Sequence, residues 1–344
     1  MSFLVFRRLA VVEFSLMLTL MLAAGETLRG EDKPKAAAPA ADAKFTVPDG
    51  GVPELTKFLK ELKLTRPRSA QERDAMLTAG RTAALKILEL EKDTKSETYQ
   101  EALMTSLQIG AQLIAGWGKD EQKKELGRFE KFLSGRPITS LEASLAMTTA
   151  TSLERSGAVE LGADAFRRFG EIIAKNSDPK VKQYGGMMAG AARRLELVGK
   201  PLELTGTKVD GEKFEIASLQ GKVVLVDFWA TWCGPCIAEY PNMKKNYEAY
   251  HAKGFEIVGV SIDQDRPALE KYLADKSVPW ITLHERDADG KHPATEHYGI
   301  FGIPAMFLVG RDGKVISIRA RGKELDKLLE EEFSKPETSA KTGG

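Results

Sequence analysis

Cysteine is scarce in this chain, which has only two among its 344 residues, and these two lie three positions apart. A disulfide framework of the kind that stabilises small secreted domains needs several widely spaced cysteines, so that class is excluded. A single Cys-x-x-Cys pair points instead to redox chemistry or to half of a metal site.

An excess of charge of either sign is also absent. The formal net charge is +1 at pH 7, and 42% of the residues are hydrophobic. This balance gives no reason to expect a nucleic-acid partner or a polybasic contact with a membrane surface. The apolar content is typical of a globular protein, and the length allows two domains.

The hydrophobic run near the N-terminus, residues 14–24, is short for a membrane span. Arg7 and Arg8 precede it, and small residues at 23–25 form a cleavage pattern. These features predict a signal peptide over 1–25 and therefore an exported protein, periplasmic or otherwise extracytoplasmic. An uncleaved N-terminal anchor and an ordinary core helix remain open alternatives.

Two segments have little with which to build a core. Residues 31–44 are rich in alanine and proline and have no apolar face, which predicts a low-complexity tether over 26–51. At the other end of the chain we expect residues 336–344 to form a disordered tail.

From 52 to 198 the apolar residues recur with a helical period. Helix starts are marked by capping boxes at 69–72 and 139–142 and by the pair Asp178-Pro179. We expect an all-α domain of six or seven helices, as a bundle or a stack of helical hairpins. No cluster of ionisable residues in it suggests a site. One helix face is marked by Leu55, Phe58, Leu59 and Leu62.

The pattern changes at Gly199. Four short apolar runs follow that are typical of buried strands, and helical stretches separate the first three. Arg311–Lys314 form a hairpin turn between the last two, and a last helix spans about 322–333. This alternation predicts an α/β sandwich over 199–335. The four predicted strands are 223–226, 255–260, 305–309 and 315–318.

The two cysteines, Cys233 and Cys236, directly follow a predicted strand and open a predicted helix. At a helix N-terminus the free N–H groups and the helix dipole favour an anion, so we expect Cys233 to have a lowered pKa and to be the nucleophile. Cys236, one turn further on, is placed to resolve a mixed disulfide. Gly234 and Pro235 set the tight entry into the helix.

The segment 226–236 resembles the active-site strand and turn of thioredoxins, and its Thr-Trp-Cys-x-x-Cys form is similar to the TlpA and ResA branch. The likeness extends over about 201–335, including Pro241 and the triplet Gly302-Ile303-Pro304. It implies a thioredoxin-like fold for this domain. It also implies thiol–disulfide oxidoreductase activity outside the cytoplasm, with no bound cofactor.

The resemblance also implies residue roles. Cys233 is the attacking and Cys236 the resolving cysteine. Asp227 is a buried carboxylate beneath the pair, where burial raises its pKa and lets it take the proton of Cys236. Glu239 tunes the pair or contacts substrate, and Pro304 follows a cis peptide bond beside the disulfide. The residues expected to contact substrate are Trp232, Gly234, Pro235 and Ile303.

The implied partners are protein thiols and disulfides, such as apocytochrome c during its maturation, and a membrane thiol that donates electrons. The Gly-Pro dipeptide favours a reductase. A disulfide-donating oxidase, or a helical partner-binding scaffold with an accessory redox domain, remains open. The stretch between Cys236 and Pro304, which includes 276–297, is longer than a minimal thioredoxin needs and puts the substrate range of a cytoplasmic thioredoxin in doubt.

Three other functions fit the sequence poorly. A structural disulfide across three residues closes a very small loop and gains little. A zinc site needs further ligands, and the spacing of His284, His292 and His297 matches no familiar pattern, so we expect these histidines in loops and at the surface. A peroxiredoxin motif needs proline seven residues before its cysteine, where Val226 and Trp229 stand.

Overall fold

A computed structural model of the protein describes residues 45–286, 290 and 292–335. The predicted signal peptide at 1–25, the tether up to residue 44 and the tail at 336–344 lie outside these residues. The contacts within the chain group Phe45–Gly344 into one compact unit. None of the helices in the described part combines the length and apolar character needed to cross a membrane.

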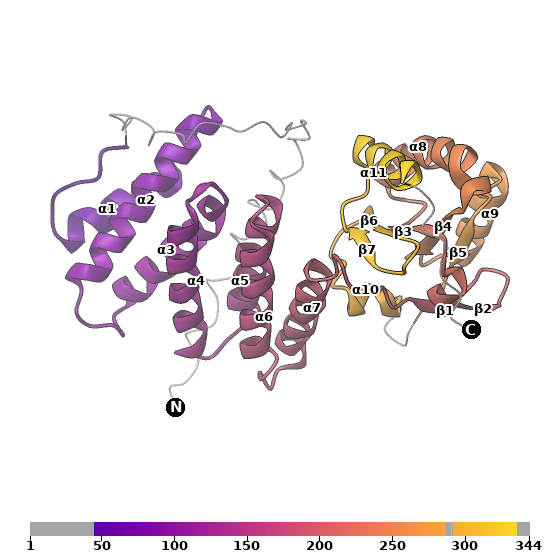
Figure 1. Cartoon of the computed structure of the whole chain (residues 1–344). Helices are drawn as coiled ribbons and strands as arrows, with labels where there is room; N and C mark the ends of the chain where they lie inside the picture. The colour runs from indigo at the N-terminus through magenta and orange to yellow at the C-terminus, as the bar shows by residue number, and fades with distance from the viewer. Residues whose placement is uncertain (1–44, 287–289, 291, 336–344) are drawn as a thin grey trace. The chain divides into compact units, whose positions relative to one another are not determined.

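Seven α-helices make up the first half of the described chain, which confirms the prediction of six or seven (Figure 1). The expected starts are present as well. Thr139 and Glu142 form a capping box, and Asp178 accepts a hydrogen bond from Lys180 N. The helices are α1 (Val52–Leu64), α2 (Ala70–Leu90), α3 (Glu97–Leu113), α4 (Lys119–Ser134), α5 (Ser140–Arg155), α6 (Val159–Ile173) and α7 (Pro179–Leu195).

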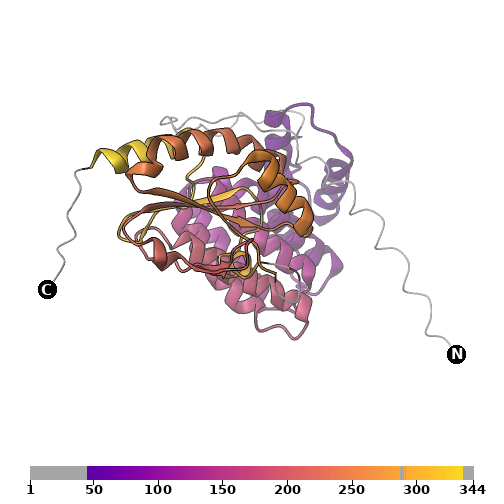
Figure 2. The ribbon, with the colours of Figure 1, turned by 90° about the vertical axis from the view of Figure 1, so that its right-hand side faces the viewer.

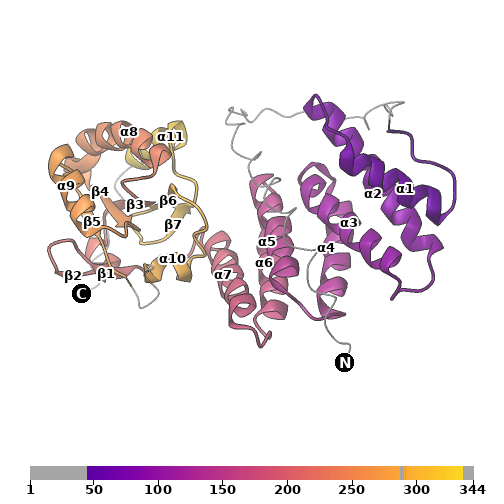
Figure 3. The ribbon, with the colours of Figure 1, turned by 180° about the vertical axis from the view of Figure 1, so that it is seen from behind.

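These helices pack mainly against their neighbours in the sequence, as a stack of hairpins (Figure 3). Phe129, Phe166 and Phe169 are fully or almost fully buried in the larger core, which α3 to α7 share. Phe45 is buried and Val47 packs against the core of α1 and α2. Packing in the described chain therefore begins within the segment predicted to be a tether.

The second half contains a five-stranded mixed sheet in the order β5-β4-β3-β6-β7. Strands β3, β4 and β5 are parallel, and β6 runs antiparallel to β3 and β7. This topology confirms the thioredoxin-like α/β sandwich. The strands are β3 (Val223–Trp229), β4 (Phe255–Ser261), β5 (Ile281–Leu283), β6 (Ala305–Val309) and β7 (Val315–Ser317).

Both faces of the sheet are covered, so β3 reads as a continuous apolar run whose seven residues are all buried. Helices α8 (Gly234–Tyr250) and α11 (Lys323–Ser334) cover one face, over Val223 and Leu225 (Figure 2). Helix α10 (Pro293–His297) and the chain around the hairpin β1 (Thr205–Thr207)–β2 (Lys213–Glu215) cover the other. Side chains alternate along a strand, so Asp227 lies on the α8 face.

Candidate redox site

The two cysteines lie at the N-terminus of α8. Cys233 is the N-cap residue, its Sγ accepts a hydrogen bond from Cys236 N at 3.2 Å, and the two are joined in a disulfide. Both are nearly buried, whereas Trp232 is 65% exposed and Gly234 and Pro235 are exposed beside it. The N–H groups of the first turn and the helix dipole favour negative charge on Cys233 Sγ once the disulfide opens.

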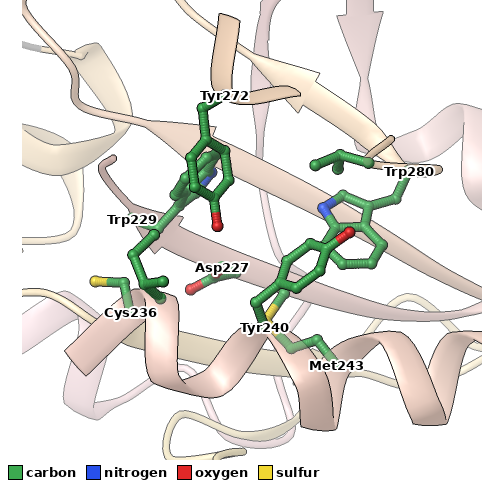
Figure 4. A pocket seen from close by; sticks show the side chains of 9 residues that line it. Asp227, Trp229, Cys236, Tyr240, Met243, Tyr272 and Trp280 are labelled. Atoms are coloured by element: carbon green, nitrogen blue, oxygen red, sulfur yellow. The ribbon is translucent and has the colours of Figure 1, made fainter. Parts of the chain in front are cut away.

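Asp227 lies beneath the disulfide, in a cavity that Cys236 also lines. Its side chain is buried, and its Oδ1 has no hydrogen-bond partner in the structure. Burial raises the pKa of Asp227 to about 8, with a smaller contribution from the negative charge of Glu239. At neutral pH this carboxyl group is therefore mostly protonated. Figure 4 shows it between Cys236 and the ring of Tyr240.

Aromatic rings form most of the wall of this cavity. The ring centroids of Trp229 and Tyr272 are 5.3 Å apart, as are those of Tyr240 and Trp280. Burial raises the pKa of Tyr240 and of Tyr272, so their hydroxyl groups stay neutral. None of the residues that the structure places in the wall of this cavity carries a positive charge. The lining residues are Asp227, Trp229, Cys236, Ile237, Tyr240, Met243, Tyr272, Val278 and Trp280.

Glu239 lies on α8 with its side chain only 17% exposed. Its Oε2 accepts a hydrogen bond from Gly322 N at 3.1 Å, and its Oε1 is 3.3 Å from Nε of Arg321. Its charge reaches the site indirectly, through the pKa of Asp227.

The peptide bond between Ile303 and Pro304 is cis, as the resemblance implied. Ile303 packs against the cluster that contains both cysteines and Trp229. Pro304 directly precedes β6, the antiparallel neighbour of β3. The structure thus brings Ile303 to the disulfide, together with Asp227 from below.

One residue of the site, Asp263, was not predicted from the sequence. Asp263 follows β4 and is almost fully buried. Its carboxylate accepts hydrogen bonds from Thr231 N at 3.1 Å and Thr231 Oγ1 at 2.6 Å, and from Ser261 Oγ at 2.9 Å. Asp263 therefore holds the turn that leads into Cys233. A signal existed, because an acidic residue just after a parallel strand lies at the same sheet edge as the cysteines.

His284 and His292 lie in loops as expected, but the expectation that the three histidines are surface residues is wrong for these two. His284 is buried and its Nε2 is 3.0 Å from the carbonyl oxygen of Asp263. His292 is buried and caps α10, while His297 is exposed. Within residues 45–286, 290 and 292–335, no three His, Cys, Asp or Glu side chains are placed to hold a metal ion.

Part of the chain is similar to known proteins. The Redoxin family model matches residues 186–330. Thiol-disulfide oxidoreductase ResA from Bacillus thuringiensis and from Bacillus cereus are each 31% identical over 142 residues, which is 41% of this chain and 79% of theirs. Among solved structures, the thioredoxin domain of a thiol-disulfide oxidoreductase from Bacteroides vulgatus is 31% identical, with a TM-score of 0.36, covering 39% of this chain and 96% of that domain.

Proposed function

The chain belongs to the family of thiol–disulfide oxidoreductases that includes ResA, and we propose that it works outside the cytoplasm as a reductase of disulfides in exported proteins, apocytochrome c among them. The proposal rests on one observation above all. Among the described residues, the cavity next to Cys236 is lined by a largely neutral carboxyl group and aromatic rings but by no cation. A disulfide becomes strongly oxidising when its reduced form is specially stabilised, and no described residue of this cavity adds a positive charge to the effect of the α8 N-terminus.

In the first step the thiolate of Cys233 attacks one sulfur of the substrate disulfide. A bond forms between that sulfur and Cys233 Sγ, and the other substrate sulfur leaves as a thiolate that takes a proton from water. Exposed Trp232 and half-buried Ile303 flank the attacking sulfur and contact the substrate.

In the second step Cys236 resolves the mixed disulfide. The ionised fraction of Asp227 accepts the proton of Cys236. This proton transfer has a small free-energy change, because the pKa of about 8 of the carboxyl group is close to that of an ordinary thiol. The Cys236 thiolate then attacks Cys233 Sγ and releases the second substrate thiol. The substrate gains two electrons, and the chain returns to the disulfide form. A partner dithiol, which we assign to a membrane donor, must reduce it again.

The mechanism is tested by trapping. Cys236→Ser leaves the attacking cysteine without its resolving partner, so mixed disulfides with exported proteins should accumulate and appear on non-reducing gels. Cys233→Ser is the matched control and should trap none. Equal trapping by both variants, or by neither, contradicts the assigned roles.

The direction of electron flow is tested by the reduction potential of the pair, measured by equilibration with a dithiol buffer. We expect a value near that of thioredoxin, about −270 mV, whereas about −120 mV would make the protein a disulfide donor. Reduction of an oxidised Cys-x-x-Cys-His peptide, compared with an unrelated exported protein, then tests apocytochrome c as substrate. Fractionation of cells that express the full chain tests the extracytoplasmic location.

A further inference from the structure

Helix α7 touches the end of α10 and the residues that follow it through the backbone. A Cβ atom added to Gly190 of α7 would lie 2.5 Å from the carbonyl oxygen of Glu296 and 2.6 Å from Gly299 N. A Cβ atom on Gly299 would overlap Ala191 N and would lie 2.6 Å from the carbonyl oxygen of Met187. Neither position has room for a side chain, so the two segments are in direct contact only because both residues are glycine.

Side chains surround this backbone contact. Arg193 of α7 donates a hydrogen bond to the carbonyl oxygen of His297. Phe166 of α6, which is fully buried, packs against Phe301 with ring centroids 6.0 Å apart. Ile318, which follows β7, packs against the core of the helical half. The contact is therefore apolar and hydrogen-bonded as well as close.

The segment held in this way leads directly to the redox site. Ile303 and Pro304 follow Phe301 by two and three residues, and Ile303 packs against the cluster that contains both cysteines. Ile300, between Gly299 and Phe301, packs into the core beneath the sheet. A single short stretch, 299–304, thus contacts the helical half at one end and the disulfide at the other.

We propose that α6 and α7 position residues 299–304, and that the helical half thereby determines how a protein substrate docks at Cys233. This rests on the proposed function, since it concerns protein disulfides as substrates. Gly190, Gly299 and Phe166 are positioning residues. Phe301, which is 38% exposed, presents part of its ring to solvent on the approach to Ile303 and extends the apolar surface that a substrate meets.

A contact that positions residues 299–304 and a contact that only joins the two halves have different measurable effects. A contact that only joins the two halves would change stability when it is disturbed and leave substrate affinity alone. A positioning contact changes the Michaelis constant for a protein disulfide. It leaves the reduction potential and the reaction with a small disulfide unchanged, because Cys233, Cys236 and Asp227 are not moved.

The test compares two glycines on the same helix in the full-length protein. Gly190→Ala places a methyl group against the backbone of the 296–299 segment, whereas Gly186→Ala meets nothing within 4 Å. Both changes raise the helix propensity of α7 by the same amount. The Michaelis constant for insulin, the rate with oxidised glutathione and the reduction potential are measured for each variant.

We expect Gly190→Ala to raise the Michaelis constant for insulin by roughly tenfold, as small displacements of binding groups do, with the other two quantities unchanged. Gly186→Ala should match the wild type in all three. Equal Michaelis constants for two folded alanine variants would overturn the proposal.

A second pair of variants covers the case in which Gly190→Ala fails to fold. Phe301→Ala removes a partly exposed ring and should raise the Michaelis constant for insulin, while Phe301→Leu should restore it. An unchanged constant for Phe301→Ala would also overturn the proposal. The proposed function is judged separately, on the wild type. If the wild type oxidises rather than reduces, the same comparison is made with reduced insulin chains.

Discussion

The carboxyl group of Asp227 opposes folding more strongly as the pH rises. Its pKa lies near its ordinary value of 3.8 in the unfolded chain and at about 8 in the folded protein. Folding therefore takes up a proton at every pH between these values. The stabilising effect of the protonated form is complete below about 4 and is lost progressively as the pH rises to about 8.

The neutral isostere Asp227→Asn should therefore stabilise the oxidised protein, with a gain that depends on pH. The difference in unfolding free energy between variant and wild type should be small at pH 4, grow by up to about 1.4 kcal/mol per pH unit, and level off above pH 8. Urea unfolding at pH 4, 6, 8 and 9 measures this difference. A difference that does not vary with pH would show that Asp227 keeps an ordinary pKa.

The same variant should be slower as an enzyme, because it has no group to accept the proton of Cys236. General-base contributions are typically about a hundredfold or more, so the release of substrate from the mixed disulfide should slow by that order. Stopped-flow measurement of mixed-disulfide decay separates this step from the first attack, which should keep its wild-type rate. Slowing of the attack instead would place Asp227 in a different role.

Asp263 should control the geometry of the turn before Cys233. Asp263→Asn keeps the shape of the side chain but weakens its bonds to Thr231, so we expect turnover with insulin to fall by roughly tenfold. Thr231→Ser keeps both donor groups and serves as the control with near-normal turnover. The reduction potential is measured in parallel. If the Asp263→Asn variant is only less stable and keeps normal turnover and a normal reduction potential, Asp263 has a purely structural role.

At this scale the sequence predicted the residues that are close together in the chain. Cys233, Cys236 and Asp227 lie within ten positions of each other, and the strand-to-helix context placed them correctly. Asp263 is 32 positions from its partner Thr231, so the pairing depends on how β4 lies beside β3. The burial of His284 has the same origin, since its ring contacts the backbone of Asp263.

At the scale of helices, a buried carboxylate of α4 forms an ion pair with α2 and lies against α3. Glu125 of α4 is almost fully buried and bonds to Arg81 of α2 at 2.6 Å, with Arg128 at 3.3 Å. A Cβ atom on Gly110 of α3 would overlap Glu125 Oε1. A buried carboxylate that loses its partners is costly, so this glycine protects the pair.

Gly110→Ala should therefore destabilise the protein, although alanine favours a helix. We expect a net loss of about 1–3 kcal/mol, because displacement of Glu125 outweighs the gain in propensity. Gly127→Ala, on the exposed side of α4 with nothing within 4 Å, is the control and should stabilise by about 0.5–1 kcal/mol. Thermal unfolding gives both values. Stabilisation by both changes would mean that Glu125 moves freely.

Most of the elements that the sequence predicted are long enough to carry a pattern, and the three-residue β7 was found because a hairpin turn precedes it. The four strands found beforehand include β3 and β4, with seven residues each. The missed strands β1, β2 and β5 have three residues each, and β5 is ordered by pairing with β4 rather than by its own composition. Helix α10, with five residues, was also missed and holds Tyr298 against the sheet.

For the whole molecule, the contact between the helical half and the α/β half could not be predicted from the sequence. Glycine leaves no apolar pattern, so nothing marks Gly190 and Gly299 as partners more than a hundred positions apart. The same holds for Arg319, whose guanidinium donates to the carbonyl oxygen of Glu154 at 2.6 Å. The sequence predicted that a helical region precedes the α/β half but left the role of this region open.

The contact between the two halves predicts that the described chain unfolds cooperatively. Interfaces between parts of a chain are often small enough to allow independent unfolding, but this one includes backbone contact and the buried ring of Phe166. We therefore expect both halves to unfold together in urea. Far-UV circular dichroism follows mainly the helical half. Tryptophan fluorescence follows mainly the other half, which holds Trp229, Trp232 and Trp280, whereas the helical half holds Trp117 alone.

The wild type and Gly186→Ala should show coincident midpoints by the two probes, and Gly190→Ala should show two separate midpoints. The separation follows because the added methyl group displaces the 296–299 segment from α7 and so weakens the contact between the two halves. Two midpoints in the wild type itself would mean that the halves fold independently, and that α7 does not hold the segment that leads to Pro304.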